Sequence, residues 1–153
     1  MKLRKTFSSG LIAAFGLFAI CGAAMAAEYA VVVNAANPVI ERGEDARDTV
    51  RRVYLKELSA WPGGAESQPF AREAGSPVQT AFVKAVLGMD ETAINDHWTR
   101  VKQTKGETPP REVGSVNILF RLVGKFEGGL SVVTAEEAAS APAEVKVLFR
   151  FSD

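Results

Sequence analysis

Six consecutive residues, from Arg72 to Pro77, carry the side chains best suited to chemistry. Ser76 stands where a predicted helix begins, with Pro77 as its first residue and Gln79 at its third, which is a capping-box pattern. A helix start directs free backbone N–H groups and the positive end of the helix dipole at an anion. Arg72 adds a guanidinium that can grip an oxyanion at two points. The segment predicts an oxyanion site, with an ordinary helix start beside a solvated arginine as the alternative.

No other group of side chains has the pattern of a reactive site. His97 is the only histidine, and we interpret it as a packing or surface residue, because nucleophilic catalysis needs a nucleophile, a base and an orienting group together. The acidic residues lack the spacing of a metal-binding loop. Asp45, Asp48 and the pair Glu136–Glu137 are expected to face solvent. The sequence therefore predicts no enzyme, no cofactor and no metal site.

Two tryptophans and one further arginine remain as candidates. Trp61 and Trp98 are interpreted as core residues, since large aromatics usually fill cores, with stacking on a ligand as the alternative. Arg111 follows two prolines and precedes another predicted helix start at Ser115. It is a second candidate for reaching an anion, and an exposed surface arginine is the default interpretation.

The N-terminus has the pattern of an export signal. Lys2, Arg4 and Lys5 precede a short apolar stretch over residues 11–20, and residues 24–26 (Ala-Met-Ala) match the small-x-small pattern of a cleavage site after Ala26. The apolar stretch is too short for a membrane span. Cys21 is the only cysteine, and the isoleucine before it does not match a lipidation motif. We therefore predict a cleaved signal peptide over residues 1–26 and a periplasmic protein.

The remaining chain, residues 27–153, is long enough for one domain with a substantial core. The whole sequence has 18 basic and 18 acidic residues, and the signal segment holds three of the basic ones, so the remainder has a net charge of −3. A mildly acidic domain is a poor partner for nucleic acid or an anionic membrane surface. Without Cys21 it also has no disulfide.

Apolar patterns alternate between strand-like and helix-like segments along the chain. Strands are expected at 29–33, 67–71, 130–134 and 145–151, and helices at 45–58, 78–87, after Asp90 and at 116–126. Such alternation indicates an α/β fold with one mostly parallel sheet flanked by helices. Ligands of such folds lie at the carboxyl ends of the strands. The loops at 34–38, at 71–76 and before Ser115 are therefore the candidate ligand-binding edge.

The order of several short motifs resembles that of the phosphate-binding proteins of ABC transporters, in particular small, single-lobe members of that periplasmic-binding-protein superfamily. The resemblance spans about residues 29–151. Its motifs are VVVNAANPV at 31–39, VYLKELSAWPGG at 53–64, REAGSP at 72–77, AFVKAVLGM at 81–89, HWTR at 97–100, GETPP at 106–110 and FEGGLSVV at 126–133.

The resemblance implies that Arg72, Gly75 and Ser76 hold phosphate, because they match the arginine, glycine and serine of the family's binding pattern. Pro77 and Val78 depart from that pattern, where the family has glycine and threonine. Proline has no N–H to donate and valine has no hydroxyl. Losing two charge-assisted bonds of roughly 1.5–3 kcal/mol each weakens binding about a hundredfold or more.

The leading hypothesis is an exported protein that binds phosphate or a related oxyanion for an ABC transport system. Asn37, at the end of the first strand, is expected to contribute to the same site. The expected partners are the anion and an ABC permease or another envelope protein. The alternative is an envelope interaction or signalling module that keeps the fold and has lost tight anion binding, which the changes at Pro77 and Val78 favour.

Overall fold

A computed structural model describes residues 25–153 of the chain. The predicted signal peptide over residues 1–26, with Cys21, lies almost wholly outside the described residues. Within residues 25–153, no helix has the length and apolar character needed to cross a bilayer.

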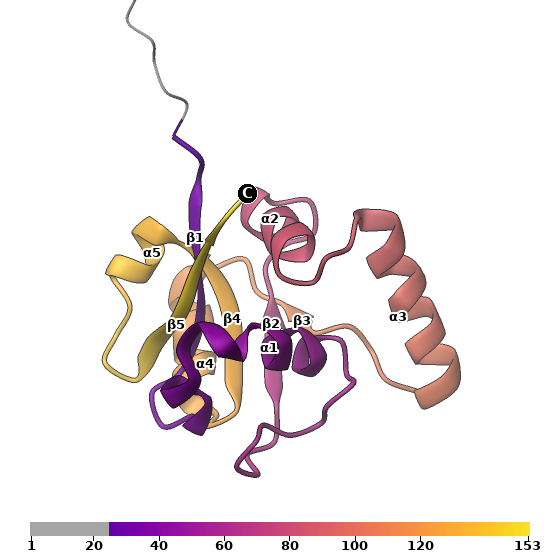
Figure 1. The fold of residues 1–153 in the computed structure, drawn as a ribbon, viewed down its shortest axis with the longest axis horizontal. Coiled ribbons are helices and arrows are strands. Elements are labelled where there is room, and N and C mark those ends of the chain that lie inside the picture. Colours follow the sequence, from indigo (N-terminus) through magenta and orange to yellow (C-terminus); the bar gives the residue numbers. More distant parts are fainter. Residues whose placement is uncertain (1–24) are drawn as a thin grey trace, which may run out of the picture.

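Strands and helices alternate along the chain, as predicted (Figure 1). The five strands are β1 (Glu28–Asn34), β2 (Gln68–Ala71), β3 (Arg111–Glu112), β4 (Gly129–Thr134) and β5 (Val145–Ser152). The helices are the 3-10 helix η1 (Pro38–Ala46) and the α-helices α1 (Arg47–Tyr54), α2 (Pro77–Ala85), α3 (Glu91–Lys105), α4 (Val116–Lys125) and α5 (Ala135–Ala139).

The strands form one mixed sheet in the order β3-β2-β4-β1-β5. β2 pairs in parallel with β3 and β4, whereas β1 runs antiparallel to both of its neighbours, β4 and β5. The α/β class is confirmed, and the sheet is less uniformly parallel than predicted. Because β1 is reversed, its carboxyl end lies at the opposite edge of the sheet from the carboxyl ends of β2 and β4.

Helices cover both faces of the sheet and enclose two apolar clusters. On one face, η1, α1 and α2 pack over Val31, Val33 and Leu130, and α3 packs against α2. On the other face, α4 and α5 pack over Ala30, Val32 and other residues. The consecutive residues of β1 thus alternate between the two clusters, as side chains of a strand must. Burial on both faces explains the continuous apolar run of this strand.

Several predicted helix starts are confirmed. The Asp90 carboxylate accepts a hydrogen bond from the Ala93 N–H at 2.7 Å and caps α3. The Ser115 hydroxyl accepts from the Ile118 N–H at 3.5 Å and caps α4. The segment after Asn37 was expected to be a loop and instead forms η1, because the Asn37 side chain caps this short helix.

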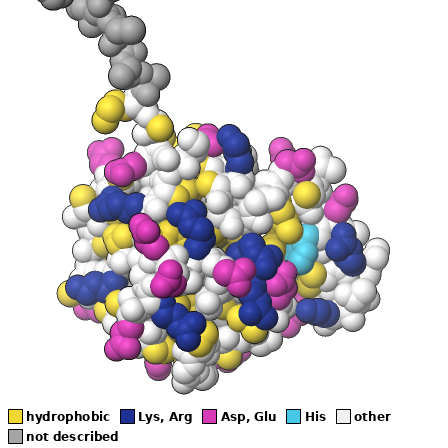
Figure 2. All heavy atoms as spheres, viewed as in Figure 1, with side chains coloured by type: hydrophobic (Ala, Val, Ile, Leu, Met, Phe, Trp, Pro, Cys, Tyr) yellow, Lys and Arg dark blue, Asp and Glu magenta, His cyan; other side chains and the backbone are white. Residues whose placement is uncertain are grey.

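Charges are well mixed over the face of the molecule shown in Figure 2. Figure 2 shows basic and acidic side chains interspersed across one face, with apolar patches between them. Because neither sign dominates there, long-range steering of a ligand is weak, and charge preference must come from local groups.

Candidate functional site

The loop between β2 and α2 contains the predicted anion-binding residues. After Arg72 the chain makes a tight turn in which the Ser76 N–H donates to the Glu73 carbonyl at 3.1 Å. Gly75 has a φ of 76°, a left-handed conformation that glycine adopts at little cost. Gly75 therefore shapes this turn through its backbone and brings Ser76 to the start of α2.

The predicted capping box of α2 is wrong, because both of its side chains have other partners. The Ser76 hydroxyl donates to the Glu73 carbonyl at 2.7 Å and makes no cap hydrogen bond to the helix. The Gln79 side chain accepts from the Arg72 N–H at 2.9 Å and donates to the Tyr54 hydroxyl at 2.9 Å. The first turn of α2 therefore keeps N–H groups without a side-chain cap.

Arg72 forms a bidentate ion pair with Glu137 of α5. The two guanidinium nitrogens lie 2.7 and 3.1 Å from the two carboxylate oxygens, and the side chains are only 12% and 24% exposed. Glu137 was expected to face solvent together with Glu136, and only Glu136 is exposed. The guanidinium has five N–H donors, so this pair leaves some of them for another acceptor.

Glu137 also completes a capping box at the start of α5. It accepts from the Thr134 N–H at 2.9 Å, and the Thr134 hydroxyl accepts from the Glu137 N–H at 3.1 Å. Burial acts to raise the pKa of Glu137, but the hydrogen bonds from Arg72 and Thr134 and the charge of Arg72 outweigh it and hold the pKa below its usual value. Glu137 is therefore ionised at neutral pH and competes with any anion for Arg72.

Asn37 does not join this site. In the antiparallel register of β1 and β4, Tyr29 faces Thr134 and Val33 faces Leu130, so Asn37 follows the end of β1 at the edge opposite Arg72. Asn37 is 2% exposed, and its side-chain oxygen accepts from the Val39 N–H at 3.0 Å. The expectation that Asn37 binds the same ligand as Arg72 is thus wrong, and its role in the structure is to cap η1.

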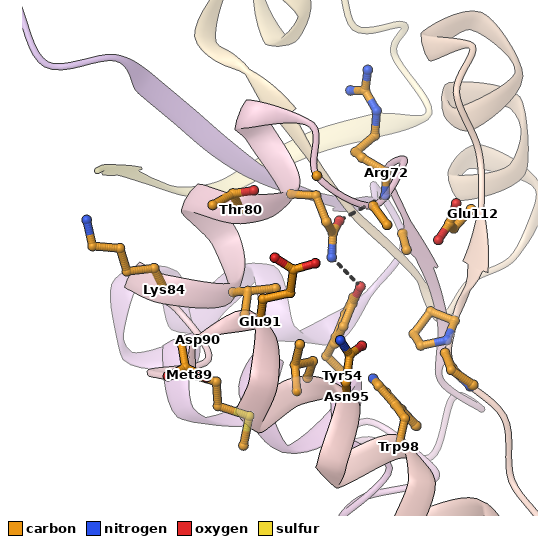
Figure 3. Close-up of a pocket in the computed structure, with 18 residues that line it drawn as sticks. Tyr54, Arg72, Thr80, Lys84, Met89, Asp90, Glu91, Asn95, Trp98 and Glu112 are labelled. Atoms are coloured by element: carbon orange, nitrogen blue, oxygen red, sulfur yellow. Dashed lines mark hydrogen bonds between the residues drawn. The ribbon is translucent and has the colours of Figure 1, made fainter.

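A groove of about 510 Å³ lies beside the loop, between α2, α3 and the β2–β3 edge (Figure 3). Apolar side chains make up much of its lining, among them Val83, Ile94, Trp98 and Pro110. Figure 3 shows the Arg72 side chain directed away from this groove, while its backbone N–H belongs to the hydrogen-bond chain through Gln79 to Tyr54. The loop therefore separates the Arg72–Glu137 pair from the groove.

Tyr54 contributes a buried phenol to the groove. The residue is 2% exposed, and burial, with a smaller effect of the Glu112 charge, raises its pKa to about 12. The phenol is therefore protonated at neutral pH and remains a hydrogen-bond donor. Its oxygen accepts from Gln79, and no described residue accepts its proton.

The structure also gives the positions of the other candidate residues named from the sequence. Trp61 and Trp98 are 2% and 8% exposed, which confirms their interpretation as core residues. The His97 ring lies 3.0 Å from the Leu55 carbonyl, through Nε2, and Arg111 is exposed on β3. Residues 25–153 contain no cluster of three or more side chains suited to a metal ion.

Two residues of this region were missed by the sequence reasoning. Thr134 and Glu137 have the spacing of a capping box, so the start of α5 was detectable from the sequence. The pairing of Glu137 with Arg72, 65 positions apart, depends on how β2 and β4 pair in the sheet. The hydroxyl of Tyr54, which lines the groove, gave no signal in the sequence.

Solved structures share this fold. The chain is similar to an ABC-type phosphate transport receptor from Vibrio cholerae, with a TM-score of 0.55 and 21% identity. It is also similar to a candidate phosphate-binding protein from Planctomyces limnophilus, with a TM-score of 0.51 and 16% identity. A third is a candidate phosphate ABC transporter substrate-binding protein with bound phosphate from Clostridium perfringens, with a TM-score of 0.53 and 15% identity.

Each likeness covers 80% of this chain and 47%, 42% and 45%, respectively, of those chains. This chain thus spans less than half of the length of the solved structures that it matches. No protein-family model matches the sequence, and no curated protein matches it.

Proposed function

We propose that this protein is exported to the periplasm and binds phosphate or a related oxyanion at the start of α2, for an ABC transport system. The anion accepts hydrogen bonds from backbone N–H groups of the first turn and from the Ser76 hydroxyl. Arg72 supplies the positive charge, and Gly75 holds the turn in place. The protein is not an enzyme and works without a cofactor.

The observation that carries this proposal is the uncapped first turn of α2, which follows the loop that begins with Arg72. Ser76 makes no cap hydrogen bond to the helix, so its N-terminal N–H groups and the positive end of the helix dipole remain available to an anion. The Arg72 donors left over by Glu137 lie at the same loop. The fold likeness to phosphate transport proteins supports the choice of anion.

The same geometry makes binding weak. Pro77 removes one N–H group from the first turn. The Ser76 hydroxyl must leave the Glu73 carbonyl, 2.7 Å away, to donate to a ligand. Glu137 adds a negative charge close to the bound anion. We therefore expect a dissociation constant in the millimolar range, about −4 kcal/mol of binding free energy.

Isothermal titration of the protein with phosphate and with sulfate tests the proposal. We expect saturable millimolar binding that weakens about tenfold in Arg72→Ala, because one charge-assisted interaction is lost. Arg111→Ala and Asn37→Ala are matched controls, since Arg111 is an exposed arginine of another element and Asn37 lies at the opposite edge. Absence of heat at millimolar anion, or equal binding by Arg72→Ala, would overturn it.

A further inference from the structure

The groove between α2 and α3 carries an inference that does not rest on the proposed oxyanion site, although Arg72 and Gly75 of that site also line the groove. Its volume of about 510 Å³ lies in the range of small-molecule sites, which are roughly 300–1,000 Å³ and mostly apolar with a few placed polar groups. Trp98, Ile94, Val83 and Pro110 provide the apolar surface. The groove thus has the size and lining expected for the body of a small organic ligand.

The charges around the groove are unbalanced. Both basic side chains of its lining are held by carboxylates outside it: Arg72 pairs with Glu137, and Lys84 lies 2.7 Å from Asp153. Glu91 and Glu112 also line the groove, and neither has an ion-pair partner among residues 25–153.

Figure 3 shows Glu91 at the start of α3 and Glu112 on β3, on either side of the Gln79–Tyr54 hydrogen bond in this view. Asp90 adds a third carboxylate to the lining, although it is engaged in capping α3. The local potential therefore favours a positive charge.

Tyr54 supplies a hydrogen-bond donor to the groove. Its side chain is almost completely buried, yet its hydroxyl lines the groove. The oxygen accepts from Gln79, while the described residues offer no acceptor for the phenolic proton. The phenolic proton can therefore be donated to a ligand oxygen placed in the groove.

We propose that this groove is a binding site for a small amphipathic cation: an ammonium or guanidinium group between Glu91 and Glu112, an apolar or aromatic body against Trp98 and Pro110, and an oxygen that accepts from Tyr54. The aromatic face of Trp98 also suits a cationic ligand. The site lies on the opposite side of the β2–α2 loop from the Arg72–Glu137 pair, so the two ligand classes are separated by charge and position.

Titration calorimetry with three ligands that share one ring tests the proposal. L-phenylalaninamide carries an ammonium, a phenyl ring and an amide oxygen, N-acetyl-L-phenylalaninamide has lost the charge, and N-acetyl-L-phenylalanine is an anion. We expect the cation to bind about tenfold more tightly than the neutral compound, and the anion to bind weakest, because a carboxylate pair near a low-dielectric surface favours the cation. Equal affinities for the cation and the neutral compound, or no binding of the cation at millimolar concentration, would overturn the proposal.

Two variants locate the site. Glu112→Gln is isosteric and is expected to remove most of the tenfold preference for the cation, whereas Glu136→Gln, on the exposed surface of α5, leaves it unchanged. Tyr54→Phe is expected to weaken all three ligands by severalfold, because it removes the donor and keeps the ring. Far-UV circular dichroism confirms that each variant is folded. A cation preference that persists in folded Glu112→Gln would place the ligand elsewhere and refute the assignment.

The variant Arg72→Ala distinguishes this inference from the proposed function. Because the groove lies on the other side of the loop from the Arg72–Glu137 pair, Arg72→Ala is expected to leave the affinity for phenylalaninamide within about twofold, a difference of less than 0.5 kcal/mol. A loss of cation binding in that variant would contradict the separation of the two sites.

Discussion

The helices α2 and α5 begin at the same edge of the sheet, and the Arg72–Glu137 ion pair joins the loop before α2 to the first turn of α5. α5 begins with a complete capping box, in which Thr134 and Glu137 satisfy each other's backbone N–H groups. α2 begins with a serine that does not cap the helix, because the Ser76 hydroxyl donates to the Glu73 carbonyl of the preceding turn. The capped start of α5 cannot bind a ligand through its N–H groups, whereas the uncapped start of α2 is a candidate to do so. The comparison therefore distinguishes a structural helix start from a candidate binding site.

Glu137 connects the two helix starts and affects them in opposite ways. Its carboxylate stabilises α5 through Thr134 and orients Arg72 toward α5. The same charge opposes an anion at α2. Under the proposed function, stability and anion affinity therefore compete at this one residue, and variants of the two helix starts can separate these effects.

Glu137→Ala is expected to have the largest effect on stability. It removes half of the capping box and leaves a guanidinium that is only 12% exposed without its partner. We expect a loss of about 2–3 kcal/mol in the free energy of unfolding, measured by urea denaturation. Glu136→Ala is the matched control, because Glu136 is exposed on the same helix. Equal stability of the two variants would show that the ion pair and the cap contribute nothing measurable.

The two N-cap residues are expected to differ when each is replaced by alanine. Thr134→Ala should cost about 1 kcal/mol, the usual value of an N-cap. Ser76→Ala should cost less than about 0.5 kcal/mol, because the exposed Ser76 hydroxyl bonds only to the Glu73 carbonyl. Thermal and urea unfolding of both variants measure the difference. Equal losses would mean that Ser76 caps α2 in solution, against the open helix start described above.

The pH dependence of Glu137→Gln gives a smaller effect with a defined sign. Glutamine also serves at the third position of a capping box, so this variant keeps the cap and loses the charge. Because the pKa of Glu137 in the folded protein lies below its usual value of 4.5, its ionised form contributes stability above that pH and loses it as the pH falls through the folded-state pKa.

The stability difference between the unmodified protein and Glu137→Gln should therefore be present at pH 7 and shrink as the pH falls below 4.5 and through the lower folded-state pKa. Urea titrations at pH 7, 5, 4 and 3 measure it. A difference that is constant across these values would show that the carboxylate charge is not what stabilises the pair.

Much of the fold could be predicted from the sequence, because its signals are local. Asp90 and Ser115 cap their helices as expected, since no nearby group competes for their side chains. Ser76 has the same type of signal, but its hydroxyl bonds to the carbonyl of Glu73, three residues earlier. Gln79, the other residue of the predicted capping box, bonds to the distant Tyr54. Local patterns thus fail where long-range contacts offer a better bond.

The direction of β1 could not be predicted, and this decided the position of Asn37. A strand buried on both faces has a continuous apolar sequence in either orientation. With β1 reversed, Asn37 lies at the edge opposite Arg72. The β2–α2 loop, by contrast, was located correctly, because Gly75 and Pro77 mark the turn and the helix start from within the loop itself.

The affinity of Glu137→Gln for phosphate tests the central claim most directly, namely that the open start of α2 binds an oxyanion in competition with Glu137. This isosteric variant removes one negative charge beside Arg72 and keeps both helix starts. Isothermal titration at pH 7 should show phosphate binding about fivefold to tenfold more tightly than in the unmodified protein, because repulsion near the guanidinium is relieved. Unchanged or weaker phosphate binding by a folded Glu137→Gln protein would contradict the account.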